Sequence, residues 1–146
     1  MNLPESFAVP TVFSWPVRVY YEDTDAAGVV YYANYLKYLE RARTEWLRAG
    51  GIAQEAYFQR TGLRFAVVRL EIDFRAPARL DDALEVSVWI ERSRRATLDL
   101  GQRIERAAGA GPALITATVR LACVDERFRP QRLPADILAC AGIPVA

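Results

Sequence analysis

The spacing of apolar residues changes along the chain, from a period of two to a period of about 3.6 and back to two. Residues 17–21 alternate between apolar and polar positions, which predicts a strand. Over residues 32–49 the apolar positions recur at helical spacing, and Gly50 and Gly51 follow directly. This pattern predicts an amphipathic helix that ends at the glycine pair. Its apolar stripe comprises Tyr31, Tyr35, Tyr38, Leu39, Ala42 and Trp46, widened by Leu36 and Leu47.

A shorter helix is predicted over residues 52–60, ending at Gly62, and the remaining chain alternates with period two. Turn signals near residues 80, 95 and 110 divide this part into four strands. One-sided alternation is typical of an antiparallel sheet with one covered face. The apolar positions of the four strands include Leu70, Ile72 and Phe74; Leu84, Val86, Val88 and Ile90; Leu98, Leu100 and Ile104; and Ile115, Ala117, Val119, Leu121 and Cys123.

The order of these elements predicts an α+β fold in which one antiparallel sheet curls around one long helix. Such a sheet leaves two edge strands, and pairing between subunits is one way to protect an edge. We therefore expect a homo-oligomer, a dimer at least, with a tetramer also open. The proline-punctuated residues 1–16 are predicted to form an N-terminal arm, and residues 17–146 a single domain.

Composition narrows the classes of function. The net charge is +1, so no overall basic or acidic excess indicates nucleic acid or an anionic membrane surface. No apolar run reaches the ~20 residues of a transmembrane helix, and the N-terminus lacks the pattern of a signal peptide. Cys123 and Cys140 lie among apolar residues and fit reduced thiols better than a disulfide framework. These features predict a cytoplasmic protein.

The chain contains no histidine. This absence excludes Ser-His-Asp and Cys-His catalytic groups, the usual zinc ligand sets and histidine general bases. An enzyme of this composition has a carboxylate as its most natural base or nucleophile, with tyrosine, cysteine or Lys37 as alternatives.

Asp25 is the carboxylate that the pattern singles out, because it lies in the predicted turn just before the long helix. One interpretation is a turn or helix-start acid, which the helix dipole stabilises. The other is catalysis, since a helix N-terminus offers unpaired N–H groups where an oxyanion could form. Position alone leaves both interpretations open.

The stretch VRVYYEDTDAAGVVYYANYLKYLERARTEWLR resembles the signature of the hotdog-fold acyl-CoA thioesterases, with the pattern D-x-D-x-x-G-x-V-x-[H/Y]-x-N-Y intact. The resemblance is closest to the Tol–Pal-associated branch, which is related to 4-hydroxybenzoyl-CoA thioesterase. It covers residues 17–134 and includes the FRAPARLDD segment. It implies a sheet wrapped around a central helix, in agreement with the periodicity, and hydrolysis of acyl-CoA without a metal or other cofactor.

The resemblance also implies roles for particular residues. Asp25, the second aspartate of the motif, would attack the thioester carbonyl or activate water. The backbone amide of Tyr32, helped by that of Ala33, would donate to the oxyanion. Many members of the branch have histidine at the position of Tyr32, so this substitution bears on substrate preference.

Further candidates have a structural and a functional interpretation. Gly28 would supply a special backbone conformation or a close approach, and Asn34 would hold the loop or contact substrate. Arg94 and Arg95 would either be solvated at a strand end or, as the resemblance to 4-hydroxybenzoyl-CoA thioesterase implies, contact the phosphates of coenzyme A with help from Thr97. For Asp23, the first motif aspartate, we expect only hydrogen bonds to nearby amides.

A rival hypothesis treats the chain as a non-catalytic module that binds an acyl chain or an acyl carrier protein. The absence of histidine and the tyrosine at position 32 motivate it.

Overall fold

A computed structural model describes residues 12–109 and 111–143. Within them, five strands form one antiparallel sheet in the order β1-β3-β4-β5-β2, so that β1 and β2 are its edges. The strands are β1 (Phe13–Arg18), β2 (Arg64–Phe74), β3 (Ala83–Ser93), β4 (Thr97–Arg106) and β5 (Ile115–Val124). The predicted antiparallel sheet is therefore confirmed.

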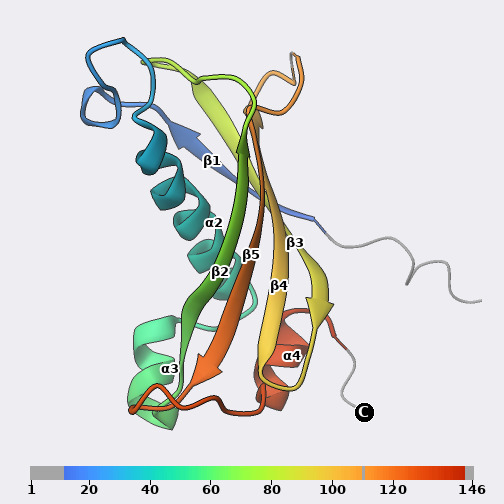
Figure 1. Cartoon of the computed structure of the whole chain (residues 1–146). Helices are drawn as coiled ribbons and strands as arrows, with labels where there is room; N and C mark the ends of the chain where they lie inside the picture. Colours follow the sequence, from blue (N-terminus) through green and yellow to red (C-terminus); the bar gives the residue numbers. More distant parts are fainter. Residues whose placement is uncertain (1–11, 110, 144–146) are drawn as a thin grey trace, which may run out of the picture.

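The long helix α2 (Tyr35–Ala49) lies across one face of the curved sheet (Figure 1). It approaches β1 and β3 most closely. A single 3-10 turn, η2 (Tyr32–Asn34), precedes it, and the short helix α3 (Gln54–Thr61) follows it. The arrangement of one sheet around one helix is the predicted one. Figure 1 also shows that the start of α2 and helix α3 lie toward opposite ends of the molecule.

The predicted apolar stripe of the long helix is confirmed for its central residues. Tyr35, Tyr38, Leu39 and Ala42 are buried against the sheet. Tyr31 is half exposed, because it precedes the helical turns and does not share their orientation. The helix ends at Gly50, and Gly51 and Gly62 adopt positive φ angles, as the predicted stops require.

The inner face of the sheet forms the other half of the core. Its fully buried side chains come from the predicted apolar positions of three strands: Leu84, Val86, Val88, Leu98, Leu100, Ile104, Ile115 and Val119. The edge strand β2 is covered less. Leu70 and Ile72 are partly buried, whereas Phe74, which the alternation places on the same face, is half exposed. An edge strand has a neighbour on one side only, so its apolar side chains lose less contact with water.

The N-terminal boundary was predicted wrongly. Strand β1 begins at Phe13 and ends at Arg18, so residues 13–16 of the predicted arm belong to the sheet. Pro16 is tolerated because β1 is an edge strand, where a missing N–H need not interrupt the ladder. Tyr21 lies in a 3-10 turn, η1 (Tyr21–Asp23), instead of the predicted strand. Residues 1–11 of the predicted arm lie outside the described residues.

Helix α4 (Ala135–Cys140) is an addition that the periodicity did not predict. It is short, and its single fully buried residue, Ile137, gives little helical pattern. None of the helices in the described ranges is long and apolar enough to cross a membrane.

Candidate active site

Asp25 lies in a tight turn between η1 and the long helix. Its backbone N–H donates to the carbonyl of Val29 at 2.9 Å, and its carbonyl accepts from the N–H of Gly28 at 3.0 Å. Its side-chain Oδ1 accepts from the N–H of Ala27 at 2.8 Å, an Asx turn that fixes the carboxylate. Within the described residues, no hydrogen bond reaches Oδ2. Asp25 is exposed, so this oxygen is free to act on a ligand.

Gly28 supplies the backbone conformation of that turn. Its φ is +80°, a left-handed conformation that glycine adopts without penalty. A Cβ at this position would meet nothing within 4 Å, so conformation and not close approach explains the glycine. Gly28 thus shapes the turn that presents Asp25.

The start of the long helix provides unpaired backbone donors beside this turn. The N–H of Asn34 donates to the carbonyl of Tyr31 at 2.7 Å. Those of Tyr32 and Ala33 donate to no acceptor within the described residues, as expected for the first turn of a helix. These N–H groups carry the partial positive charge of the helix start, which favours a developing anion.

A cavity of about 320 Å³ brings Asp25 and Tyr32 together. Its other walls are mostly apolar and come from the Asp25 turn, from the start of the long helix, and from the end of β2 with the segment that follows it. They include Val30, Tyr35, Phe74 and Pro77. The rings of Tyr32 and Phe74 meet edge to face at 6.1 Å between centroids. The cavity can therefore hold an apolar group next to Asp25 and next to Tyr32, the first residue of the turn that begins the helix.

Hydrogen bonds fix the wall opposite the long helix. The hydroxyl of Tyr35 accepts from the N–H of Ala78 at 2.9 Å, and both residues are buried. The carbonyl of Ala78 in turn accepts from the N–H of Val30 at 2.9 Å. Burial raises the pKa of the Tyr35 hydroxyl, so the side chain stays neutral. The segment around Ala78 is thereby tied to both the helix and the Asp25 turn.

Asp23 lies behind the cavity and is only 5% exposed. Its Oδ2 accepts from the N–H of Tyr20 at 2.8 Å, and its Oδ1 accepts from the side-chain amide of Asn34 at 2.7 Å. The expectation that Asp23 binds nearby amides is confirmed. Asn34 is itself buried and does not line the cavity, so the structure supports its loop-holding role over substrate contact.

The electrostatics of Asp23 keep it ionised. Burial alone would raise the pKa of the carboxyl, but the hydrogen bonds from Tyr20 and Asn34 and the charge of Arg41 together lower it below its usual value. The hydroxyl of Tyr38 lies close by but has no hydrogen-bond partner of good geometry. Burial and the neighbouring Asp23 charge raise the pKa of that hydroxyl.

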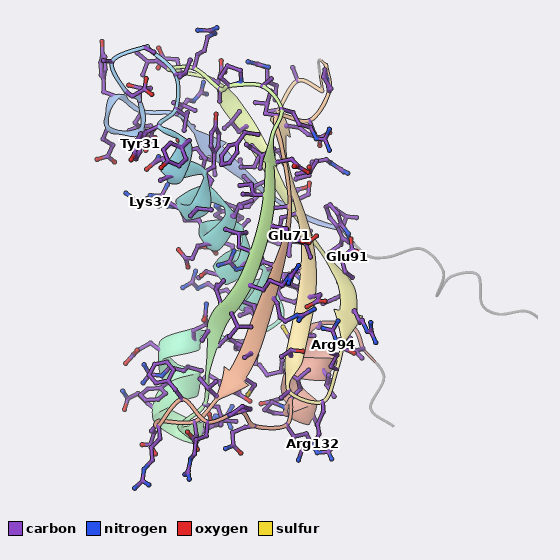
Figure 2. The ribbon with its side chains drawn as sticks, viewed as in Figure 1. Tyr31, Lys37, Glu71, Glu91, Arg94 and Arg132 are labelled. Atoms are coloured by element: carbon purple, nitrogen blue, oxygen red, sulfur yellow. The ribbon has the colours of Figure 1, made fainter. Side chains whose placement is uncertain are left out.

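The cavity is not lined by the predicted coenzyme A ligands, Arg94, Arg95 and Thr97. They connect β3 to β4, and Figure 2 shows Arg94 far from Tyr31, toward the other end of the molecule. Arg94 donates to Asp99 Oδ2 at 3.0 Å, and its backbone N–H donates to the Thr97 carbonyl at 2.8 Å. Arg95 has an exposed side chain. Strand β3 spans 11 residues, so about 35 Å separate its two ends.

The segment after β2 is the part of the site that sequence reasoning missed. Phe74, Ala76 and Pro77 line the cavity, although Phe74 was placed with the buried face of its strand. The FRAPARLDD stretch contributes to the family resemblance, but its residue pattern does not indicate a cavity wall. Phe74 is the last residue of an edge strand, and that position leaves its ring half exposed.

The fold and the cavity define a hotdog-type α+β protein with an acidic residue facing a helix start. The family model described as "Thioesterase-like superfamily" matches residues 19–140. The chain therefore belongs to the thioesterase-like superfamily, and the predicted hotdog fold is confirmed.

Individual relatives agree with this placement. The chain is 45% identical over 130 residues to "Acyl-CoA thioester hydrolase YbgC" of Escherichia coli O6:H1, which covers 88% of this chain and 95% of that protein. It is 44% identical to "Acyl-CoA thioesterase YbgC" of Haemophilus influenzae, covering 87% and 92%. The predicted resemblance to the Tol–Pal-associated branch is thereby confirmed. A solved structure, a probable thioesterase from Bartonella henselae, matches with a TM-score of 0.78 at 36% identity, covering 85% of this chain and 100% of that chain.

Proposed function

We propose that this chain hydrolyses acyl-CoA thioesters to a carboxylic acid and coenzyme A, with Asp25 as the reacting carboxylate. One observation carries the proposal: Asp25 and Tyr32, whose N–H is unpaired at the helix start, line the same mostly apolar cavity. The relatives named as acyl-CoA thioester hydrolases support the reaction class.

The chemistry follows from the two sides of the cavity. The thioester carbonyl oxygen would accept from the Tyr32 amide, helped by that of Ala33, so that negative charge develops where the helix start stabilises it. Loss of one oxyanion donor typically lowers the rate about a hundred- to a thousandfold. Because these donors are backbone groups, a tyrosine at position 32 can serve as well as a histidine. Its phenol is then free to form part of the acyl pocket.

Asp25 can act in two ways. Its free Oδ2 could attack the thioester carbonyl and expel coenzyme A as the thiolate, which gives a mixed anhydride that water then hydrolyses. Alternatively, it could take a proton from a water that attacks the carbonyl, and coenzyme A again leaves as the thiolate. A single turnover in ¹⁸O-labelled water tests for the anhydride route. Label in the Asp25 side chain would indicate an anhydride that water opens at the carboxyl carbon of Asp25. Label in the product acid alone would be the result of general-base catalysis or of an anhydride that water opens at its acyl carbon.

The test of the proposed function is a panel of acyl-CoA substrates with a dye that traps free thiol, corrected for Cys123 and Cys140 by a blank without substrate. Asp25→Asn keeps the Asx turn, because the amide oxygen of Asn can still accept from Ala27. We expect this variant to fold normally and to lose turnover by at least a hundredfold. Asp136→Asn, a remote exposed acid on α4, serves as the matched control and should retain full activity. Undiminished turnover in Asp25→Asn would refute the assignment.

The same panel separates the rival function. A non-catalytic module for an acyl chain or an acyl carrier protein would bind acyl-CoA tightly and release no thiol with any chain length. The free carboxylate oxygen beside unpaired backbone donors favours the enzyme, since binding an apolar chain requires neither.

We also propose that two copies of the chain associate, as a dimer at least. Several apolar side chains on β2 and at the start of the long helix are substantially exposed: Tyr31, Tyr32, Leu36, Val67, Val68 and Phe74. A second copy paired along the unpaired edge of β2 would cover them. Sedimentation equilibrium measures the state, and a monomer at micromolar concentration would contradict the proposal.

Dimer formation could complete the binding site for coenzyme A. Arg94, Arg95 and Thr97 are too far from Asp25 within one chain to share its ligand at the reacting end. They could contact the phosphates of coenzyme A only if a second copy placed its β3–β4 turn near the cavity. Arg95 is the better anion ligand of the two arginines, because its side chain is exposed, whereas Arg94 is paired with Asp99, which Arg120 also contacts. The unpaired thiols of Cys123 and Cys140 fit the further proposal of a cytoplasmic location.

A further inference from the structure

Asp23 holds both sides of the reactive turn at once. Its carboxylate accepts from the backbone N–H of Tyr20, before the turn, and from the side chain of Asn34, at the start of the long helix. Its backbone carbonyl accepts from the N–H of Tyr31 at 2.8 Å. Two of these bonds end on Tyr31 and Asn34, which flank Tyr32 and Ala33, and the third ends on Tyr20, before the turn that carries Asp25.

The two side-chain hydrogen bonds at residue 23 require a carboxylate at that position. Both of its bonded partners are N–H donors, so both side-chain oxygens of residue 23 must accept. An asparagine has only one acceptor oxygen, and its amide group would face a second donor. The site is buried, so water cannot readily replace the lost bond.

Asp23 nevertheless does not line the cavity and cannot touch a ligand there. Its effect on a reaction must therefore pass through the positions of Tyr32 and Asp25. A shift of about 1 Å between reacting groups can lower a rate about a hundredfold.

We infer that Asp23 is a positioning residue, whose buried carboxylate sets the oxyanion donors of the helix start relative to Asp25. This inference rests on the proposed thioesterase activity. It assigns different tasks to the two aspartates of the D-x-D motif: Asp25 reacts and Asp23 aligns.

The test is an exchange of the two buried partners. Asp23→Asn alone places two donors face to face, and Asn34→Asp alone places two carboxylates face to face. In the double variant D23N/N34D, the amide oxygen of residue 23 accepts from Tyr20 and its amide group donates to the carboxylate at residue 34. Both side-chain hydrogen bonds are then restored, and the one between residues 23 and 34 has its donor and acceptor exchanged.

We expect each single variant to lower kcat about tenfold to a hundredfold with KM changed less than threefold, and the double variant to recover kcat to within about fivefold of wild type. Asp136→Asn, which loses hydrogen bonds of the same kind far from the cavity, is the control and should keep kcat. Full kcat in folded Asp23→Asn would overturn the inference, as would a double variant no better than the singles.

A second measurement does not depend on activity. Hydrogen exchange at the backbone N–H of Tyr31, which donates to the Asp23 carbonyl, should be faster in Asn34→Ala than in wild type, because the side-chain tie to Asp23 is lost, while exchange in β4 is unchanged. Equal protection of the Tyr31 N–H in the two proteins would also overturn the inference. If wild-type protein shows no turnover with any acyl-CoA, the proposed function fails, whereas the exchange result still reports on the alignment.

Discussion

Replacing Tyr35 by phenylalanine removes one buried hydroxyl and little else. The ring can keep its contacts with Tyr38 and Phe74, whose centroids lie 6.2 and 6.0 Å away. The N–H of Ala78, which is fully buried, loses its acceptor at 2.9 Å. An unsatisfied buried donor costs about 1–3 kcal/mol. For a chain of 146 residues, this corresponds to a decrease in Tm of roughly 4–10 °C.

The matched control is Tyr32→Phe, because the Tyr32 hydroxyl makes no hydrogen bond within the described residues and its ring is 63% exposed. Scanning calorimetry should show a change in Tm of less than about 2 °C for this variant. Since Ala78 follows the cavity wall, Tyr35→Phe should also raise KM about threefold or more. Equal Tm values for the two variants would refute the assigned role of the Tyr35 hydroxyl.

Three further predictions concern the turn, the buried acid and the second arginine. Gly28→Ala should lower stability by about 1 kcal/mol in urea titrations, and Gly28→Asn by less, because asparagine tolerates a φ of +80° better. The pKa of Asp23 is lowered in the folded state, so its contribution to stability is present above the unfolded value of 3.8 and declines as the pH falls below it. The difference in unfolding free energy between wild type and Asp23→Asn should therefore be constant above about pH 5 and shrink in more acidic buffer; a pH-independent difference would contradict this. Arg95→Ala should raise KM for acyl-CoA about tenfold at low salt and leave kcat unchanged, whereas Arg94→Ala should have a smaller effect on KM.

Periodicity was enough to predict the central part of the fold. Tyr38 in the helix, and Val86 and Leu100 in the strands, are fully buried, as the spacing of apolar residues predicts. Each of them lies inside a regular element, where the period of that element alone determines which side chains face the core. The wrong predictions concern residues of the two edge strands, where the position of the strand in the sheet also affects burial and pairing. The sequence around Pro16 predicts an interruption of the strand, but Pro16 belongs to the edge strand β1. The alternation predicts that Phe74 is buried, but Phe74 is the last residue of the edge strand β2. Neither edge position is visible in a local pattern, because strand order is a property of the whole sheet.

The candidate site could be predicted only in part for a related reason. Asp25 and Tyr32 are seven residues apart, and one turn leading into a helix brings them to one cavity. The opposite wall comes from residues 74–77, some 40 positions further on, and its place depends on the hydrogen bond between Tyr35 and Ala78. Arg94 and Arg95 were predicted from the family resemblance and from the affinity of arginine for phosphate. Neither gives the length of strand β3, which separates the two arginines from Asp25.

The two aspartates of the motif show why residue type alone could not assign the roles. Asp23 and Asp25 are chemically identical and two positions apart, yet the 3-10 turn between Tyr21 and Asp23 directs one inward and the following turn leaves the other exposed. Both oxygens of Asp23 are occupied by N–H donors, so its charge is stabilised and its nucleophilicity is lost. In Asp25, Oδ1 accepts a hydrogen bond from Ala27 and Oδ2 accepts none within the described residues. The first oxygen fixes the orientation of the carboxylate, and the second is available to react. For these two aspartates, we therefore expect the number of hydrogen bonds that each carboxylate accepts to distinguish the reacting residue from the structural one.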